Sequence, residues 1–542
     1  MKAKILDCTL RDGAYLIDKK FGAKNIRGIS NGLKETGIDI IELGFLQDVG
    51  QGEGKTVYLN SKDAEKYIPA QKGKTLFSVL ADYSRYTIAN LDPYTGKSFD
   101  IVRACFFKEE REGVLSFCKQ IKDKGYKVCI QPVDILGYSD LEIIELIEKI
   151  NIIEPYSFSI VDTFGSMYVE DLRRVYYLVD HNLISTASIG FHSHNNMQLS
   201  NALSQEFLQL TSGGRGAIVD TTISGMGRGA GNTPTELVVQ YMNSRLGYDY
   251  NMDALLDIID VYMNRIRVQC DWGYNTPYFL AGCFSAHVNN IAYLLKKNSI
   301  RSKDMRYILN KLSKQERKRY DYDCLERKYE EVMQSEIDDK IAFEKLKVCL
   351  KGENVLIIAP GKSVEIERET IKDYIKINKA KVIMINYLDM DFSPSFVYMN
   401  NVKRFHYWQL ENNGFDEAKT IITSNVCENM NYRGYIISFR RLANCGWTHM
   451  DNSAILLLRL LDQLEVKSVG IAGMDGYSED PRDNYVEDMA ILNGYDTSVE
   501  LNEAIYKMLK EFIINRESKN SVWFVTKSRF ATEELSEIGG RC

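Results

Sequence analysis

A regular alternation of short apolar runs with amphipathic stretches, over roughly the first 225 residues, constrains the fold of this chain most. Eight runs rich in β-branched and aromatic residues recur at intervals of about 25 to 35 residues, the spacing of successive βα units. They are 4–7, 38–45, 75–81, 101–107, 127–133, 158–162, 188–194 and 217–223. Helical periodicity shows between them, for example over 141–150. The pattern predicts an α/β fold that begins with a closed (β/α)8 barrel rather than an open doubly wound sheet.

Polar residues follow or end several of these predicted strands. In a (β/α)8 barrel the chemistry takes place where strands end and βα loops begin, so we expect such residues to converge at one rim. The candidates are Arg11 and Asp12 after the first strand, Glu42 in the second, Asp162 at the end of the sixth, His192 and His194 in the seventh, and Asn232 in the glycine-rich run after the eighth.

The histidine pair is the most specific of these signals. Side chains alternate faces along a strand, so His192 and His194 point the same way and their rings can share one metal ion. The chain has only six histidines, and two of them stand in register here. The alternative is a pair of surface histidines at a strand end.

Each remaining candidate also has an ordinary structural explanation. Asp12 could favour the first turn of a helix beside a surface Arg11, and Glu42 could pair with a neighbouring cation. The glycine-rich run at 224–232 could be a flexible turn, because a glycine pattern alone is weak evidence for a dinucleotide loop. Their ordered combination favours a single site.

Taken in order, five motifs resemble those of the DRE-TIM metallolyase superfamily over roughly residues 4 to 300. They are Thr-Leu-Arg-Asp-Gly at 9–13, Ile-Glu-Leu-Gly-Phe at 41–45, Asp-Thr-Phe-Gly at 162–165, Phe-His-Ser-His-Asn-Asn at 191–196 and Gly-Arg-Gly-Ala-Gly-Asn-Thr-Pro-Thr-Glu at 227–236. Within the superfamily the chain is most similar to the 4-hydroxy-2-oxovalerate aldolase branch. Hydroxymethylglutaryl-CoA lyase and isopropylmalate synthase are more distant relatives.

The resemblance implies a divalent-metal site. Asp12, His192 and His194 match the ligand positions, and Asn232 matches a position that supplies a further ligand in some members. Such a set suits Mn²⁺, the ion we expect, and also Mg²⁺ or Zn²⁺, while leaving positions open for substrate. A 2-oxo acid such as pyruvate would bind there and react with an aldehyde partner through its enolate.

The resemblance also implies supporting roles for two residues. Arg11 would place a fixed positive charge beside the developing enolate oxygen. Glu42 would orient Arg11 or a metal ligand.

One position departs from the aldolase pattern. In that branch a histidine closely follows Arg-Asp-Gly and serves as acid/base, whereas this chain has Tyr15. A phenol, with a reference pKa of about 10, needs a cation or metal nearby to move a proton. Tyr15 is therefore a catalytic candidate, and the alternative is that it only shapes the pocket. Because of this departure we expect a substrate other than the usual substrate of the 4-hydroxy-2-oxovalerate aldolases. Tyr274, Tyr278 or His287 could also reach the site, although a hydrogen-bonded place in the core explains His287 better.

The chain is expected to contain three regions: the barrel at 1–245, a helical extension packing on it at 246–350, and a Rossmann-like α/β domain at 351–542. The last region has strand-like runs at 355–358, 381–385, 420–423, 468–473 and 522–526, and an apolar helix at 453–464. Ligands of such sheets bind beyond the carboxyl ends of the strands, which indicates 361–363, Asn386 and 473–476. The first of these lacks the spacing of a P-loop.

Residues 444–447 and 470–477 resemble the nucleotide-sugar-binding cores of sialyltransferase-like and related surface-glycan proteins. The resemblance implies a nucleotide or nucleotide-linked ligand in the C-terminal domain. The alternative is a domain used only for dimerisation or substrate channelling.

Composition excludes other classes of protein. A net charge of −6 argues against a general nucleic-acid binder. No apolar run approaches the roughly 18 residues that span a bilayer, and no signal-peptide core follows Met1, so we expect a cytoplasmic protein with no membrane partner. Eleven cysteines without a CxxC pair fit reduced thiols. The aldolase resemblance implies a homodimer.

The sequence thus predicts a metal-dependent aldolase or lyase acting on a 2-oxo acid, with surface-glycan or sugar-acid metabolism as its setting. A Claisen-type enzyme using a coenzyme A thioester is one alternative, although the sequence shows no adenine-nucleotide site at the barrel mouth. A catalytically silent barrel kept as a binding scaffold is another, motivated by the missing histidine.

Overall fold

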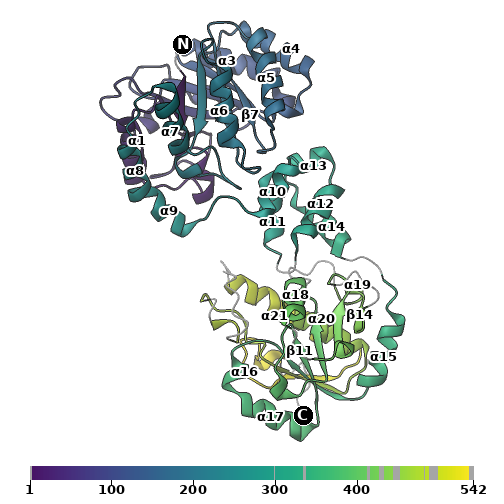
Figure 1. Ribbon diagram of the computed structural model, residues 1–542. Coiled ribbons are helices and arrows are strands. Elements are labelled where there is room, and N and C mark those ends of the chain that lie inside the picture. Colours follow the sequence, from purple (N-terminus) through teal and green to yellow (C-terminus); the bar gives the residue numbers. More distant parts are fainter. Residues whose placement is uncertain are drawn as a thin grey trace. The chain divides into compact units, whose positions relative to one another are not determined.

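The structure is a computed structural model that describes residues 3–297, 300–333, 337–411, 415–426, 432–443, 452–480, 483–486 and 498–535. The chain divides into two compact units (Figure 1). The first contains residues 1–291 and 313–320, and the second contains 292–312 and 321–542. The division into three regions at residues 245 and 350 stays a prediction.

Eight parallel strands close into a barrel in the first unit, as predicted. They are β1 (Lys4–Asp7), β2 (Ile40–Leu46), β4 (Leu76–Asp82), β5 (Ile101–Phe106), β6 (Lys127–Pro132), β7 (Ser157–Asp162), β8 (Ser188–Ser193) and β9 (Ala217–Thr221). The barrel closes because β1 pairs with both β2 and β9. A two-residue strand, β3 (Val57–Tyr58), adds to β2; it is too short to show a periodic pattern in the sequence.

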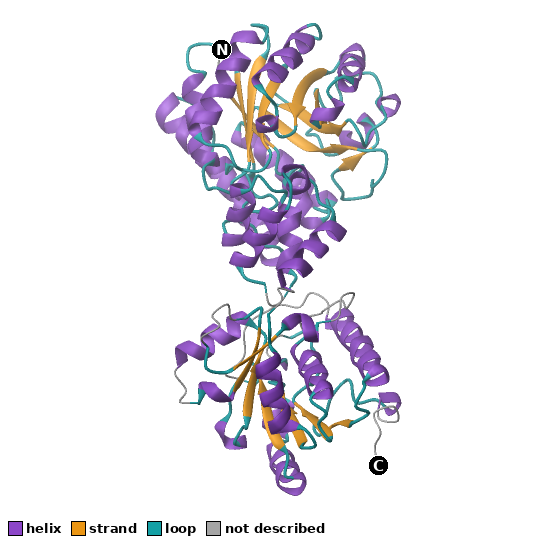
Figure 2. Cartoon of the chain, turned by 90° about the vertical axis from the view of Figure 1, so that its right-hand side faces the viewer, coloured by secondary structure: helices purple, strands orange, loops and turns teal. Residues whose placement is uncertain are grey.

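Amphipathic helices alternate with the strands and cover them (Figure 2). They are α1 (Ala23–Thr36), α3 (Gly113–Asp123), α4 (Asp140–Asn151), α5 (Val169–Asn182), α6 (Ser200–Leu210) and α7 (Thr235–Leu246). Helix α4 shows why they form: Ser139 and Glu142 make a capping box, and four apolar residues at helical spacing are buried.

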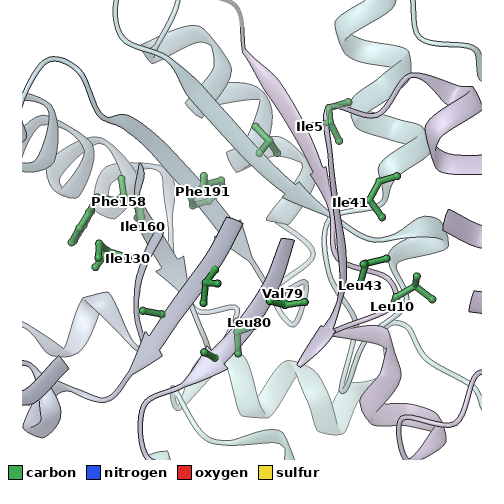
Figure 3. Packing of buried hydrophobic residues seen from close by; sticks show 14 of the residues in the cluster. Ile5, Leu10, Ile41, Leu43, Val79, Leu80, Ile130, Phe158, Ile160 and Phe191 are labelled. Atoms are coloured by element: carbon green, nitrogen blue, oxygen red, sulfur yellow. The ribbon is translucent and has the colours of Figure 1, made fainter. Parts of the chain in front are cut away.

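The outward-facing residues of the strands pack under these helices. Figure 3 shows Ile41, Val79, Ile130, Ile160 and Phe191, from five of the strands, in this core. Each is at most 1% exposed. Burial on both faces of a parallel sheet explains why the strands appear in the sequence as nearly continuous apolar runs.

The inward-facing residues change from apolar to charged along the strands. Ile40, Ile101 and Ile218 belong to a small apolar cluster, and the next inward positions, two residues further on, are Glu42, Arg103 and Asp220. The charged layer therefore lies toward the carboxyl ends of the strands, where barrels of this type carry their sites.

Helices follow the barrel strands in the same unit. They include α8 (Met252–Ile258), a π-helix at Ile259–Met263, α9 (Asn264–Gln269), α10 (Thr276–Cys283) and α13 (Lys314–Lys318), while α11 (Val288–Leu295) starts there. Helix α10 packs against the loops that follow β7 and β8: a Cβ atom added to Gly282 would lie 3.1 Å from the carbonyl oxygen of Gly165 and 2.9 Å from Cγ of Met197. It therefore lies at the carboxyl-end rim of the barrel.

The second unit contains an open, fully parallel sheet. Its strands are β10 (Asn354–Ile358), β11 (Lys381–Ile385), β12 (Phe396–Met399), β13 (Thr420–Thr423), β14 (Tyr435–Ile437), β15 (Ser468–Ala472) and β16 (Ser521–Phe524), in the order β14-β13-β12-β11-β10-β15-β16. The open α/β architecture was predicted, but the short strands β12 and β14 were not. Helix α20 (Ser453–Gln463) is the predicted apolar helix. No helix in the described part of the chain is both long and apolar enough to cross a membrane.

Candidate metal centre

The loop after β1 supplies the carboxylate of the candidate site. A tight turn, in which the backbone N–H groups of Arg11 and Asp12 both donate to the carbonyl of Cys8 at 3.0 and 2.8 Å, directs the two side chains inward. Nη1 of Arg11 lies 2.6 Å from Oδ2 of Asp12. Both residues are buried, although they follow the strand rather than belonging to it.

The histidine pair stands opposite this carboxylate. Strand β8 ends at Ser193, so His194 is the first residue beyond it, held by a bridge to Asn232. Nε2 of His192 lies 3.3 Å and Nε2 of His194 lies 3.9 Å from Oδ2 of Asp12. One candidate ligand atom from each of the three residues falls within 4.8 Å of the others.

The donor set fits a divalent cation. Two buried oxygens here, Oδ1 of Asp12 and Oδ1 of Asn232, have no hydrogen-bond partner. The amide of Asn232 is fixed because its Nδ2 donates to the carbonyl of Met226 at 3.1 Å. Burial lowers the pKa of His194 to about 4, so its imidazole is neutral and able to bind a metal at neutral pH. Carboxylate, imidazole and amide ligands are those that divalent cations take in proteins.

A closed ring of buried charged and polar side chains surrounds this centre. Nε of Arg11 donates to Oε2 of Glu42 at 2.7 Å, and Nη1 of Arg103 donates to the same oxygen at 2.9 Å. Nη2 of Arg103 donates to Asp220, whose Oδ2 lies 3.0 Å from Nδ1 of His192. The ring runs through Asp12, Arg11, Glu42, Arg103, Asp220 and His192 and returns to Asp12.

The ring keeps Asp12 and Asp220 ionised. Burial alone would raise the pKa of Asp12, but Arg11 and the two histidines hold it well below its ordinary value. Burial likewise opposes ionisation of Asp220, and Arg103 together with His192 lowers its pKa nonetheless. The metal centre is therefore preorganised around permanent negative charge.

Arg103 and Asp220 were not among the residues predicted for the site. Each is the single charged residue inside an apolar strand, in Ile-Val-Arg-Ala-Cys-Phe and Ala-Ile-Val-Asp-Thr. A lone charge at an inward-facing strand position is the sequence signal that could have identified them, because such a charge needs a buried partner.

Tyr15 lies at the edge of the site. The guanidinium of Arg228 lies 3.9 Å from the centre of its ring, and Phe45 makes an edge contact at 5.2 Å. Burial raises the pKa of Tyr15 although Arg228 and Arg11 act to lower it, so the phenol keeps its proton at neutral pH. Of the other aromatic candidates, Tyr274 is 59% exposed, and burial raises the pKa of Tyr278.

In the second unit, the predicted ligand loops contact each other at the ends of β10 and β15. The backbone N–H of Ser363 donates to Asp475 at 2.7 Å, and its hydroxyl donates to the same carboxylate at 2.5 Å. At the end of β11, Nδ2 of Asn386 donates to Ser453 at 2.7 Å, and Oδ1 of Asn386 is buried without a partner. The motif at 444–447 lies outside the described residues.

Comparisons with known proteins concern the barrel unit. Residues 2–262 match the HMGL-like family. Oxaloacetate decarboxylase of Mycobacterium tuberculosis is 27% identical over 243 residues, which cover 44% of this chain and 70% of that protein. 4-Hydroxy-2-oxovalerate aldolase of Carboxydothermus hydrogenoformans is 29% identical over 270 residues, covering 48% of this chain and 76% of that protein.

Among solved structures, HMG-CoA lyase from Brucella melitensis superposes with a TM-score of 0.40 and 15% identity, covering 49% of this chain and 99% of that one. The family match, residues 2–262, includes all eight barrel strands, the Asp12–His192–His194 group and the charged ring around it. Residues 2–262 are therefore an HMGL-like domain of the DRE-TIM metallolyase superfamily, as the ordered motifs predicted.

Proposed function

We propose that the barrel unit is a divalent-metal-dependent carbon–carbon lyase that makes or breaks a bond of a 2-oxo acid, such as pyruvate, by way of its enolate. The observation that carries the proposal is the convergence of Asp12, His192 and His194 within 4.8 Å inside a buried charged ring. The printed activities of the relatives, aldolase and oxaloacetate decarboxylase, support it, because both reactions release or consume the enolate of pyruvate.

In this proposal Asp12, His192 and His194 hold the metal, and the unpartnered Oδ1 of Asn232 completes the set. A divalent ion there would act as a Lewis acid toward the oxygens of the 2-oxo acid. Mn²⁺ is the ion we expect, because mixed imidazole, carboxylate and amide ligands suit it and leave coordination positions for the oxygens of the substrate.

Arg11 and Glu42 support the chemistry. The guanidinium of Arg11 is held by Glu42 at 2.7 Å and by Asp12 at 2.6 Å, so it cannot swing away when negative charge develops on a substrate oxygen. A donor fixed before the reaction stabilises that charge without reorganisation. Glu42 positions Arg11 and Arg103 together, because both donate to its Oε2 atom.

Tyr15 is assigned to the wall of the substrate site. Its phenol stays protonated and its ring is packed between Arg228 and Phe45, so it can donate a hydrogen bond but is a poor base. Transfer of a proton to or from substrate through Tyr15 would require the phenolate, which burial disfavours.

The test is the exchange of pyruvate methyl protons with deuterated water, followed by NMR. The full chain is loaded with Mn²⁺ and compared with the same protein in EDTA and with His192→Ala. His181→Ala is a matched control, because this exposed histidine lies on α5 and stacks on Tyr177. Exchange that requires metal and His192 but not His181 is expected; a metal-loaded protein without exchange would contradict the proposal. Cleavage of an acyl-CoA thioester would favour the Claisen alternative, and failure to bind any metal would favour the scaffold.

For the second unit we propose a nucleotide-linked ligand at the carboxyl ends of β11 and β13. The support is a pair of buried amide oxygens without partners, Oδ1 of Asn386 and Oδ1 of Asn425, on the loops that follow these strands. Calorimetric titration of the full chain with CMP and UDP tests it, and Asn386→Ala should weaken any binding tenfold or more. A homodimer, a cytoplasmic location and a role in surface-glycan metabolism stay predictions.

A further inference from the structure

His287 lies in the turn between α10 and α11, at the rim of the barrel. Its neighbour Val288 packs against the glycine-rich loop after β9: a Cβ atom added to Gly229 would lie 2.8 Å from Cγ1 of Val288. Gly229 is adjacent to Arg228, whose guanidinium covers Tyr15 in the metal site. The contact fixes the turn carrying His287 beside this loop.

Hydrogen bonding determines which nitrogen of His287 carries the proton. The backbone N–H of Asn289 donates to Nδ1 at 3.1 Å, so Nδ1 is an acceptor. A neutral imidazole with Nδ1 as acceptor carries its proton on Nε2. No described residue accepts a hydrogen bond from Nε2, and this nitrogen is not one of the buried atoms that lack a partner, so it faces space that water can reach. The ring itself is held against Tyr320, with ring centres 4.7 Å apart.

The electrostatic surroundings of His287 keep it neutral. Burial, which is the largest cause, and the electrostatic interactions with Arg228 and His194 together lower its pKa to about 3. His194, one of the groups whose electrostatic interaction lowers this pKa, is the least buried of the three candidate ligands. The side chain of His194 is 15% exposed, compared with 6% for His192 and 3% for Asp12.

We propose that His287 is a catalytic hydrogen-bond donor that binds the oxygen of the aldehyde partner in the carbon–carbon bond step. The inference rests on the proposed function and names a second charge-stabilising group for the same site. During condensation the aldehyde oxygen gains negative charge as the new C–C bond forms, and the Nε2–H group of His287 stabilises it. During cleavage the same donor stabilises the alkoxide before the C–C bond breaks.

The assignment to the aldehyde oxygen, not the enolate oxygen, follows from position. Arg11 contacts Asp12 within the buried charged ring, whereas the turn that carries His287 lies beside Gly229, next to Arg228, which covers Tyr15 at the edge of the site. A substrate whose 2-oxo acid end lies beside Arg11 therefore presents its other end toward His287. The proton exchanged by the substrate hydroxyl passes to and from water, because Nδ1 is occupied by Asn289 and His287 keeps its own proton throughout.

Two variants of the full, Mn²⁺-loaded protein test the proposal. His287→Phe keeps a ring but removes the donor, and His287→Gln restores an N–H donor on a flexible side chain. Three reactions are compared: deuterium exchange into pyruvate, decarboxylation of oxaloacetate, and condensation of pyruvate with acetaldehyde, glycolaldehyde or glyceraldehyde. The first two pass through the enolate without an aldehyde oxygen, so they report on the proposed function alone.

We expect His287→Phe to lower the rate of condensation by about 10²-fold or more, the loss typical of a removed oxyanion donor. The rate of condensation with His287→Gln should be at least tenfold higher than with His287→Phe. In both variants, the rates of deuterium exchange and of oxaloacetate decarboxylation should stay within about threefold of those of the unmodified protein. Condensation unaffected by His287→Phe, or exchange lost in equal proportion, would overturn the inference while leaving the enolate chemistry in place. Exchange without condensation with any of the aldehydes would overturn it as well. Absence of exchange in the unmodified protein would instead reject the proposed function.

An independent measurement needs no substrate. In protein labelled with ¹⁵N-histidine, the His287 resonances should show a neutral ring protonated at Nε2 from about pH 5 to about pH 9. A proton on Nδ1, or titration of this ring near its ordinary pKa of about 6.5, would rule the donor role out.

Discussion

Nδ1 of His192 lies 3.0 Å from Oδ2 of Asp220, and this contact determines which nitrogen of the histidine faces the metal centre. Asp220 is anionic, because Arg103 and His192 lower its pKa against the effect of burial. An anionic acceptor at Nδ1 keeps the proton there and leaves the lone pair of Nε2 directed at the centre. This contact connects His192, a candidate metal ligand, to the layer of charged side chains inside the barrel.

Asp220→Asn should lower the affinity for Mn²⁺ by about 10- to 100-fold, the usual cost of losing the partner of a ligating histidine. The amide accepts a hydrogen bond from Nδ1–H less strongly than the carboxylate, so the tautomer protonated at Nδ1, which leaves Nε2 free to bind the metal, is less favoured. Electron paramagnetic resonance of free Mn²⁺ during titration measures the change. Asp180→Asn is the control, since Asp180 pairs with Arg215 on an outer helix and should leave affinity unchanged. Equal affinities in all three proteins would contradict a role for Asp220.

Arg103→Leu should destabilise the barrel by about 3–5 kcal/mol, because it leaves the buried carboxylates of Glu42 and Asp220 without their shared cation. Denaturant unfolding of the metal-free protein measures this free energy. Arg174→Leu removes a surface pair with Asp140 and should cost less than about 1 kcal/mol. If Arg103→Leu lowers the free energy of unfolding by no more than Arg174→Leu does, the ion pairs of the ring do not stabilise the barrel.

Arg11→Ala should slow deuterium exchange into pyruvate by about 10²- to 10³-fold while Mn²⁺ still binds, because the variant removes a fixed donor and no ligand. Glu42→Gln should slow it by a smaller factor, since Arg11 remains but is held less firmly. Exchange rates by NMR and Mn²⁺ binding are measured on the same samples. Glu112→Gln, on an exposed pair with Lys149, is the control. Loss of metal binding in Arg11→Ala would assign Arg11 to the integrity of the centre instead.

The pH dependence of stability should contain a contribution from Asp7. Burial raises its pKa from 3.8 to about 6, against the lowering effect of hydrogen bonds from Thr235 and Thr9. The folded protein therefore holds this proton more tightly than the unfolded chain. The resulting stabilisation is complete below about pH 4 and is lost as the pH rises through about 6, a loss of about 3 kcal/mol.

Asp7→Asn removes that titration and keeps an oxygen that can accept from Thr235. The unmodified protein should lose about 3 kcal/mol of unfolding free energy relative to the variant between about pH 4 and about pH 7.5. Asp18→Asn, at an exposed position, is the control measured in the same way. A constant difference for Asp7→Asn would show that its pKa is not raised.

Much of the barrel could be predicted from the sequence because its strands are buried on both faces. Such strands appear as isolated apolar runs, and β1, predicted at 4–7, has the same bounds in the structure. The histidine pair could be predicted for a related reason: the two-residue period of a strand places His192 and His194 on one side before any tertiary contact is known. Short edge elements such as β3 and β14 carry too few residues to show a period.

The sequence by itself determined the alternation of strands and helices, the five ordered motifs and the identity of the metal-ligand candidates, because these follow from local periodicity and residue chemistry. Only the tertiary structure decided that Arg103 and Asp220 join Glu42, Arg11, Asp12 and His192 in one closed ring. It also decided that the turn carrying His287 lies beside the glycine-rich loop at Gly229, with Nδ1 of His287 accepting from Asn289. Barrel closure brings residue 220 beside residue 103, and no local pattern encodes a contact between side chains 117 positions apart.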